Sequence, residues 1–515
     1  MVTQFKQTQR GCHAGHRKPR PQTAWAMSFA FKTLPLQRRT IRAMNTPSSP
    51  QCPFRAQPSS APPLCHPPGV WPPGPPTGVT GWGLLRRMSN DMLGTLASWQ
   101  QSFGDVVHLR IWPEHQIVVA DPQLARDLLV THHEALIRWE RGMRVFSRLQ
   151  GHSVFIAEGD IWRGKRHALL PNFSRKAVEA FVPSMVAAVE QAFTRWPQKD
   201  PRWPVESALT SVAMDLILRM MFSTALGDDA RIAERAVHTV IVAANAEFYW
   251  PASAPDWAPW KRTKRAALAM LRDMVGRHLQ ARMRQPRDSW PGDLLSSLLQ
   301  MHFDDPQAWP LQAVHDECMT TFLAGHETLA ATLTWWVWCM AGHATVQAAA
   351  CGEVRSVLAG RAPTVDHLRS LPYLTQTLQE TLRLYPSAPV LNSRRSLKPI
   401  TLGAWQFPAR TMFMVPVQAM HHDSRWFPDP LAFRPERFAP GAPEVPRGAY
   451  LPFGAGPRVC LGQHLAMTEL TVIAAMLLQR FQLSVPDGMS APQPVLHVSL
   501  RPSRPLFLQL APVLP

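Results

Sequence analysis

The chain carries, at residues 453–462, the sequence Phe-Gly-Ala-Gly-Pro-Arg-Val-Cys-Leu-Gly, which sets one cysteine in a glycine-rich loop. Apolar residues recur at helical spacing from Leu465 to Leu478, so we expect a helix that begins near Leu461 and has Cys460 at its positive end. A thiolate there would be stabilised before any metal arrives. The glycines leave room for main-chain amides to turn toward the sulfur and for a flat cofactor to lie against the loop. The stretch therefore predicts that Cys460 is a metal ligand.

This loop matches all six fixed positions of a known signature, Phe-Gly-x-Gly-x-Arg-x-Cys-x-Gly. The chain thereby resembles the cytochrome P450 family, whose members hold haem b through a cysteine thiolate. The resemblance implies that Cys460 binds the haem iron and that Phe453, Arg458 and Gly462 contact the cofactor. A buried free cysteine in a turn is the alternative interpretation, and the further motifs below disfavour it.

A second motif, Glu380-Thr381-Leu382-Arg383, lies in a segment from Tyr373 to Tyr385 whose leucines recur at helical spacing. An acid and an arginine three residues apart are neighbours on a helix, and most such pairs are solvated surface contacts. In the family that the chain resembles, this pair meets an arginine of a later Pro-Glu-Arg-Phe segment, which is Arg437 here. The resemblance therefore implies a buried, structural charge network of Glu380, Arg383 and Arg437 behind the haem.

A third motif, Ala324-Gly325-His326-Glu327-Thr328, lies in a long helical pattern over about residues 311–340. It resembles the oxygen-activation segment of the family's central helix. Gly325 omits a side chain where O2 must fit, and the Thr328 hydroxyl can bond the carbonyl four residues earlier and open the helix locally. Glu327 adds a carboxylate for proton delivery. We expect these three residues to be catalytic; the alternative is a buried helix with an incidental acid.

Candidate contacts to the haem propionates come from side chains that donate hydrogen bonds to carboxylates. Trp162 and Arg166 resemble the family's Trp-x-x-x-Arg segment and lie one helical turn apart, so both can face one carboxylate. Two pairs of identical neighbouring residues resemble further propionate-binding positions. In such a doublet, the resemblance does not show which of the two residues binds. The members that we select are Arg394 over Arg395 and His421 over His422.

The resemblance extends from about Pro72 to the C terminus and implies the cytochrome P450 fold, which is mainly α with a small β region. We expect a single haem-thiolate catalytic domain over residues 71–515, although the length alone would allow more domains. Residues 106–110 and 116–120 have the pattern of strands, and Asp121-Pro122 follows as a helix start. This order fits a sheet edge early in the fold.

Residues 1–70 differ in composition from the rest of the chain. Residues 45–76 hold twelve prolines, which exclude a helix and predict an extended linker. Twelve Lys or Arg and no acid precede Asp91, and the whole chain carries a net charge of +18. We expect a disordered basic leader, interpreted as a transit peptide, an anionic-surface contact or, preferably, upstream sequence read from a wrong start codon, with Met27 or Met44 as the start. No nucleic-acid recognition motif accompanies the charge.

The function that these residues predict is a haem-thiolate monooxygenase, which inserts one atom of O2 into an apolar substrate and reduces the other to water. The chain shows no flavin-binding or ferredoxin-like cysteine pattern, so the electrons are expected from a separate ferredoxin or flavodoxin with its reductase. Arg163, Lys165 and Arg434 are candidates for attracting such an acidic partner. Fatty acids, alkanes, terpenes and polyketides stay open as substrates.

Two other functions are compatible with a haem-binding chain. A peroxide-driven hydroxylase of the same family resembles this cysteine loop, but such members lack the acid–alcohol pair that Glu327 and Thr328 provide here. A non-enzymatic haem gas sensor or electron carrier would have no use for proton-relay residues. Both are therefore ranked below the monooxygenase.

The predicted location is the bacterial cytoplasm. Seven cysteines without a CxxC pair or a disulfide framework indicate a reducing compartment. No run of about twenty apolar residues precedes the proline-rich segment, so no transmembrane anchor is expected. The excess of arginine over lysine favours a GC-rich bacterial genome.

Overall fold

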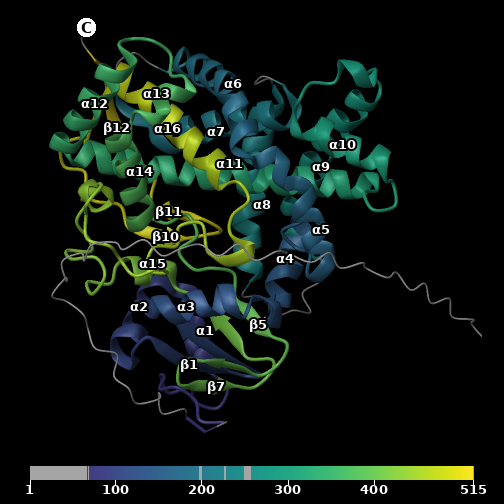
Figure 1. Ribbon diagram of the computed structural model, residues 1–515, viewed down its shortest axis with the longest axis vertical. Helices are drawn as coiled ribbons and strands as arrows, with labels where there is room; N and C mark the ends of the chain where they lie inside the picture. The colour runs from purple at the N-terminus through teal and green to yellow at the C-terminus, as the bar shows by residue number, and fades with distance from the viewer. Residues whose placement is uncertain (1–65, 68, 197–199, 225–227, 249–256, 514–515) are drawn as a thin grey trace, which may run out of the picture. The chain divides into compact units, whose positions relative to one another are not determined.

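The computed structural model describes residues 66–67, 69–196, 200–224, 228–248 and 257–513. Helices form most of this part of the chain, and the strands near the N terminus lie with α1 and α2 at the lower end of Figure 1. The helices are α1 (Trp82–Asn90), α2 (Met92–Phe103), α3 (Pro122–Arg126), α4 (Glu140–Gln150), α5 (Gly159–Leu169), α6 (Arg175–Phe193), α7 (Val205–Phe222), α8 (Asp228–Glu247), α9 (Arg262–Met283), α10 (Leu294–Asp304), α11 (Leu311–Gly342), α12 (Ala344–Leu358), α13 (Val365–Arg369), α14 (Pro372–Leu384), α15 (Val417–His421) and α16 (Gln463–Arg480).

The strands are short and form small sheets. They are β1 (Val106–Ile111), β2 (Glu114–Val119), β3 (Leu136–Arg138), β4 (Asp200–Pro204), β5 (Arg394–Ser396), β6 (Ile400–Leu402), β7 (Trp405–Phe407), β8 (Met412–Met414), β9 (Phe481–Ser484), β10 (Pro494–Leu496), β11 (Leu500–Pro502) and β12 (Phe507–Pro512). The predicted strand pair and the following helix start are confirmed, because β1 and β2 pair antiparallel and Asp121 caps α3 through the main-chain N–H of Leu124.

Helix α11 runs through the middle of the helical part of the molecule (Figure 1). It is buried on nearly all sides, because its sequence is apolar on every face rather than along one stripe. Trp335 and Trp336 lie fully inside the core, where their indole N–H groups donate to the carbonyl of Leu500 and the hydroxyl of Thr377, both at 2.9 Å. These bonds remove the cost of burying the indole N–H and let each ring bury its large apolar area.

The largest sheet brings charged residues from distant parts of the chain together. Its strand order is β1-β2-β8-β5-β3, and β5 pairs antiparallel with β3 so that Arg138 lies opposite Arg394. Residues directly opposite in adjacent strands have side chains close to one another. The sheet register therefore places two arginines side by side at its β3–β5 edge.

The predicted leader, residues 1–70, falls almost wholly outside the described residues. At its border, the Trp71 ring stacks on His108 of β1 and His115 of β2, with ring centroids 4.6 Å and 4.3 Å away. His66 stacks on Trp405 of β7 in the same way, at 4.0 Å. Within the described part of the chain, no helix combines the length and the apolar character that crossing a membrane requires.

Candidate functional site

The cysteine loop is a tight turn that presents Cys460 to open space. The main-chain N–H of Cys460 donates to the carbonyl of Phe453 at 3.0 Å, which closes the loop, and the thiol side is exposed. Gly456 has φ +72°, and a Cβ there would lie 2.2 Å from the carbonyl oxygen of Leu129, so only glycine fits. A Cβ on Gly462 would meet nothing within 4 Å. One side of the loop therefore has room for a flat group, as predicted.

The structure modifies the predicted electrostatics of the thiol. Helix α16 begins at Gln463 rather than near Leu461, and Cys460 lies just before its N terminus. Burial raises the pKa of Cys460 above its ordinary value, although the N–H of Gly462 and the charge of Arg166 favour the thiolate. A thiol with a raised pKa loses its proton when a metal ion binds, so we expect deprotonation to accompany metal binding.

The buried middle of the central helix has two exposed residues. Ala324 and Thr328 are exposed there and lie one turn apart, hence on one face. The Thr328 hydroxyl donates to the carbonyl of Ala324 at 2.9 Å, which is the predicted bond to the residue four positions earlier. Leu461, next to Cys460, packs against the apolar cluster that includes Phe322 and Leu323 of α11. The residue after Cys460 and the middle of α11 thus share one apolar cluster.

Gly325 has a different role from the one predicted. A Cβ at this position would lie 2.6 Å from Cδ1 of Ile217 on α7, so the missing side chain lets α7 and α11 approach closely. It does not leave room for O2, because it points at the neighbouring helix. The small residue on the exposed face of α11 is Ala324.

Glu327 is held by the C-terminal hairpin β10–β11. Its carboxylate accepts from Arg501 at 2.7 and 3.0 Å and from the Ser499 hydroxyl at 2.5 Å. Burial alone would raise the pKa of Glu327, but Arg501, with help from Ser499, outweighs it and lowers the pKa to about 2. The acid is therefore ionised and engaged away from Thr328, so the predicted acid–alcohol pair is not assembled as a proton donor. Sequence reasoning missed Arg501, which no local pattern marks.

A pocket near the β3–β5 edge has an arginine-rich lining. Arg458 lies 4.0 Å from the ring centroid of Trp162 and pairs with Glu158, which also accepts from the main-chain N–H of Arg138 at 3.1 Å. The pocket is lined by Leu128, Leu129, His133, Leu136, Arg138, Glu158, Arg394, Ala455 and Arg458. It joins the cysteine loop to the sheet edge and to the loop before α5.

This pocket is short of negative charge. Burial and the charge of Arg458 lower the pKa of Arg394 to about 10, and burial with Arg458 and Arg394 lowers the pKa of Arg138. The buried Nε of Arg138 has no hydrogen-bond partner within the described chain. Glu158 is the one carboxylate that lines the pocket beside three guanidinium groups. Because two propionate carboxylates would supply the missing charge and acceptors, this chain fits haem b.

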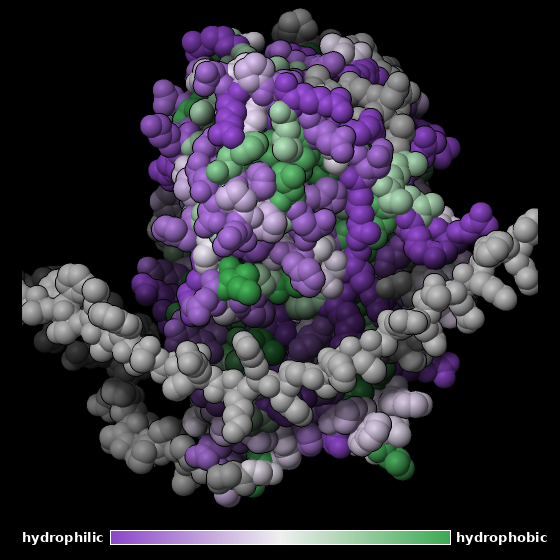
Figure 2. Space-filling view, turned by 90° about the vertical axis from the view of Figure 1, so that its right-hand side faces the viewer, coloured by the Kyte–Doolittle hydropathy of each residue, from purple (hydrophilic) through white to green (hydrophobic). Residues whose placement is uncertain are grey.

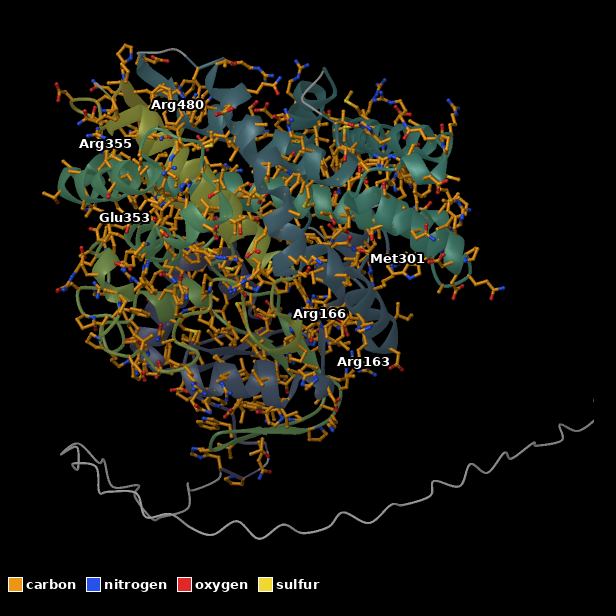
Figure 3. All side chains as sticks on the ribbon, turned by 45° about the horizontal axis from the view of Figure 1, so that its top comes forward. Arg163, Arg166, Met301, Glu353, Arg355 and Arg480 are labelled. Carbon is orange, nitrogen blue, oxygen red and sulfur yellow. The ribbon has the colours of Figure 1, made fainter. Side chains whose placement is uncertain are left out.

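The predicted propionate contacts Trp162 and Arg166 lie differently with respect to Arg458, a residue of the arginine-lined pocket. Trp162 is buried on α5 beneath Arg458, and Arg166 lies 6.0 Å from the same ring. Figure 3 shows Arg166 and Arg163 close together on α5, with Arg163 nearer the edge of the molecule. Sequence reasoning missed Arg138 and Glu158; the only local signal was a charged residue at the end of the apolar strand β3.

Hydrogen-bond partners distinguish the two members of the arginine doublet and test the choice of histidine. Arg395 donates to Glu114 and Glu140, each at 2.7 Å, and so points away from the pocket that Arg394 lines. The selection of His421 is wrong. Its Nε2 accepts the N–H of Leu451 at 2.8 Å and its Nδ1 lies 3.1 Å from the carbonyl of Arg383.

Neither member of the histidine doublet has a ring nitrogen aimed at the pocket. Burial lowers the pKa of His421 to about 3, so this imidazole stays neutral and cannot attract a propionate by charge. His422 bonds the carbonyl of Leu384 at 2.9 Å. Both histidines therefore tie α14 to the segment around α15 instead of binding a cofactor.

The structure brings together the three residues of the predicted charge network. Arg383 forms a bidentate pair with Glu380 at 2.7 and 2.8 Å, and both side chains are fully buried. Arg437 reaches the same carboxylate at 3.2 Å, and the main-chain N–H of Arg434 adds a bond at 2.9 Å. The remaining donors of Arg383 bond the carbonyls of His421, Pro430 and Ala432. The network thus joins α14 to the segment before the cysteine loop.

Comparison with known proteins agrees with this geometry. The family model for cytochrome P450 matches residues 72–510. The chain belongs to the cytochrome P450 family. Its P450 fold is also that of a solved structure, the retinoic acid-bound cyanobacterial CYP120A1, with a TM-score of 0.75 and 24% identity over 86% of this chain and 99% of that one.

Two P450 relatives with assigned reactions are similar to this chain over most of their length. The cyclooctat-9-en-7-ol 5-monooxygenase of Streptomyces melanosporofaciens is 31% identical and covers 76% of this chain and 88% of that protein. The cytokinin hydroxylase of Arabidopsis thaliana is 28% identical and covers 82% and 84%. The chain is thus a P450 monooxygenase whose cofactor is haem iron.

We expect Arg138→Met to lower the affinity for haem about tenfold, since it removes a charged donor to a propionate. The haem-free variant should be no less stable than the unmodified chain, because the buried repulsion with Arg394 and Arg458 is relieved. Haem transfer to an acceptor protein and thermal unfolding of both forms would measure the two effects. Arg144→Met, at an exposed position of α4, is the matched control. Equal haem affinity in both variants would contradict the assignment.

Proposed function

We propose that this P450 hydroxylates an apolar small molecule with electrons delivered by a separate redox protein, and that its catalytic domain is residues 71–515. The observation that carries the proposal is that Cys460, on the turn before α16, and Ala324 with Thr328, in the buried middle of α11, are exposed. Haem bound through Cys460 supplies the activation of O2. The chain binds and orients the substrate and supplies protons.

The region beside α11 favours an apolar substrate. Phe146 of α4 contacts Phe155 and Phe248 at centroid distances of 5.1 and 5.4 Å. These rings, with Val154 and Val498, are partly accessible and adjoin the apolar cluster of α7, α8 and α11. Apolar walls bind an apolar molecule by removing its surface from water, and they orient it without strong polar contacts. The relatives named for cyclooctat-9-en-7-ol and cytokinin oxidation show that substrates vary across the family.

Thr328 is the residue that we assign to proton delivery. Reduction of one oxygen atom of O2 to water consumes two electrons and two protons, and the protons must reach a site enclosed by apolar residues. The hydroxyl of Thr328 is exposed on α11, and it can turn from the carbonyl of Ala324, give its own proton and take another from water. Glu327 is held by Arg501 and does not meet this hydroxyl directly.

The electron donor is proposed to be an acidic protein such as a ferredoxin or flavodoxin. Arg163 on α5 and Arg434 before Pro435 have side chains 57% and 51% exposed, as a docking surface requires. Lys165 drops out of the predicted set, because its ammonium bonds the buried Glu317 at 2.7 Å and is only 12% exposed. Figure 2, which faces the right-hand side of Figure 1, shows a surface that is largely hydrophilic with scattered hydrophobic patches.

A reducing compartment, such as the bacterial cytoplasm, is part of the proposal. Cys318, Cys339 and Cys351 are present as free thiols in the helical core. Burial raises the pKa of Cys351, with no nearby charge sufficient to offset it, so this thiol is unreactive. Thiols buried in this way are typical of proteins that never meet an oxidising compartment.

The engagement of Glu327 by Arg501 favours one alternative, a peroxide-driven hydroxylase, because such an enzyme needs no acid beside Thr328. The deciding experiment measures product formation and O2 consumption with a ferredoxin and its reductase, and separately with hydrogen peroxide alone. We expect substrate-dependent O2 consumption matched by hydroxylated product. Product with peroxide and none with the reductase would establish the alternative, and haem binding without any turnover would favour a sensor.

A further inference from the structure

Glu158 places its carboxylate among the guanidinium groups of the arginine-lined pocket. It stands just before the first residue of α5, where side chains commonly bond the free N–H groups of the helix, but it makes no such bond. One carboxylate oxygen instead accepts the main-chain N–H of Arg138 at 3.1 Å, and the other pairs with Arg458. Both oxygens therefore serve residues that lie outside α5.

The other hydrogen bonds of the two arginines bring no negative charge. Arg458 donates to the carbonyl of Ala157 at 2.9 Å. Arg138 donates to the carbonyl of Phe155. Main-chain carbonyls accept hydrogen bonds but carry no net charge, so these bonds satisfy donors without neutralising the guanidinium groups. The counter-charge for both arginines therefore comes from Glu158.

Glu158 acts on all three arginines that line the pocket. Burial lowers the pKa of Arg138, Arg394 and Arg458, and repulsion from neighbouring arginines lowers it further. In each case the negative charge of Glu158 opposes the lowering. The side chain of Glu158 is 29% exposed, so water screens this charge only in part.

The charges of the pocket match those of a haem with two ionised propionates. Its three guanidinium groups and one carboxylate leave a net charge of +2, which two propionates would cancel. Without Glu158, the same pocket would keep one uncancelled positive charge after haem binds. One-electron reduction of the haem adds a negative charge, and a nearby positive charge favours the reduced form.

We propose that Glu158 is a positioning residue of the haem pocket, which acts through Arg458 and Arg138 to set the charge that the haem meets. In the haem-free protein, its carboxylate offsets the repulsion among the three guanidinium groups. In the haem-loaded protein, it competes with a propionate for Arg458 and adds negative charge, which weakens haem binding and lowers the reduction potential. The inference goes beyond the proposed function, because it needs haem in the pocket but no particular substrate or electron donor.

The first test compares Glu158→Gln, Glu158→Asp and the control Glu134→Gln by redox titration of the haem-loaded protein. For Glu158→Gln, we expect the equilibrium for one-electron reduction to shift toward the ferrous form by about threefold or more, which is roughly 28 mV. Glu158→Asp keeps the charge and should keep most of the native potential. Glu134→Gln removes the same charge next to the pocket residue His133, but the Glu134 side chain is 77% exposed, so the potential should change much less.

Haem release and the stability of the haem-free chain separate this role from a merely structural one. Glu158→Gln should release haem to an acceptor protein about threefold more slowly, because Arg458 is then free to bind a propionate. The haem-free variant should unfold at a lower temperature than the native haem-free chain, since the guanidinium groups lose their counter-charge. A residue that only shaped the pocket would instead release haem faster when it is replaced.

The double variant Glu158→Gln/Arg138→Met keeps the inference testable if Glu158→Gln folds poorly. It removes one carboxylate and one guanidinium group, so the reduction potential and the haem-free stability should both return toward their native values. An unchanged or lower potential in Glu158→Gln, faster haem release from it, or an equal shift in Glu134→Gln would each overturn the inference alone. A native protein that binds no haem would overturn the proposed function as well.

Discussion

Cys460→Ser abolishes the strongly red-shifted Soret band that we expect from the dithionite-reduced, carbon monoxide-bound protein. A thiolate donates far more electron density to haem iron than a hydroxyl does, and that band reports the donation. The serine variant should also lose monooxygenase turnover by at least about a hundredfold, since changes even around a metal ligand cost 10- to 100-fold. The absorption spectrum of the reduced, carbon monoxide-bound form measures the first effect, and product formation measures the second.

The cysteine experiment has an internal control. Cys351 on α12 is a buried thiol whose sulfur lies 3.8 Å from the carbonyl of Leu478, remote in sequence from the cysteine loop. Cys351→Ser should keep the shifted band and the turnover, with at most a modest loss of stability. A native protein that binds haem with an ordinary, unshifted band would show that another group holds the iron. A shifted band that persists in Cys460→Ser would disprove the ligand assignment directly.

Cys460 also carries a prediction about pH. Because burial raises the pKa of the thiol in the haem-free chain, the proton must leave when iron binds, so haem loading should become tighter as the pH rises toward that pKa. This dependence of haem affinity on pH should be weaker in Cys460→Ser, because a serine hydroxyl has no proton to release in this pH range. Haem binding that is independent of pH in the native chain would mean that the thiolate forms before the metal arrives.

Glu380→Ala is expected to yield misfolded, haem-free protein. The carboxylate lies at 0% exposure and holds two arginines and one main-chain N–H, so its removal strands the charge of Arg383 in the core. Breaking a buried pair by removing one partner typically costs about 3–5 kcal/mol, a large part of the stability of a domain. Arg383 would keep its bonds to three carbonyls, but no counter-charge. Thermal unfolding and the haem content of the purified protein measure the effect.

Glu436→Ala is the matched control for this loss. Glu436 lies one residue before Arg437, is exposed, and bonds the hydroxyl of Tyr373 at 3.0 Å. Its replacement should change the free energy of unfolding by less than about 1 kcal/mol, as for most surface positions. A stable, haem-containing Glu380→Ala protein would refute the structural role of the network. Comparable losses in both variants would show that the segment tolerates no change, whatever the charge.

Several parts of this molecule follow from local sequence. The cysteine loop, the α11 and α14 helices and the β1–β2 pair were predicted from residues within a few positions of one another. These elements depend on local patterns: glycines at fixed places, leucines at helical spacing and alternating residues in strands. Such patterns determine local backbone geometry, whatever the rest of the chain does. The pair of Glu380 and Arg383 belongs to this class, because three residues of helix place both side chains on one face.

The chemical environment of the site depends on contacts between distant segments. Arg501 lies 174 residues after Glu327, and Lys165 lies 152 residues before Glu317, yet each pair forms a direct ion pair. No periodicity or spacing encodes such distances, since the packing of whole helices and sheets decides which charges meet. The surface role predicted for Lys165 was wrong for this reason, and the ion pair of Glu327 with Arg501 could not be predicted either.

The sequence by itself therefore determined the family and the fold, because these depend on residue types at short, fixed spacing. Only the tertiary structure decided that Gly325 makes room for Ile217, that His421 bonds the main chain, and that Arg138 joins Arg394 across the β3–β5 pair. Each of these outcomes depends on which atoms lie within a few ångströms after folding, and short-range hydrogen bonds and steric contacts cannot be assigned until the distant segments are packed together.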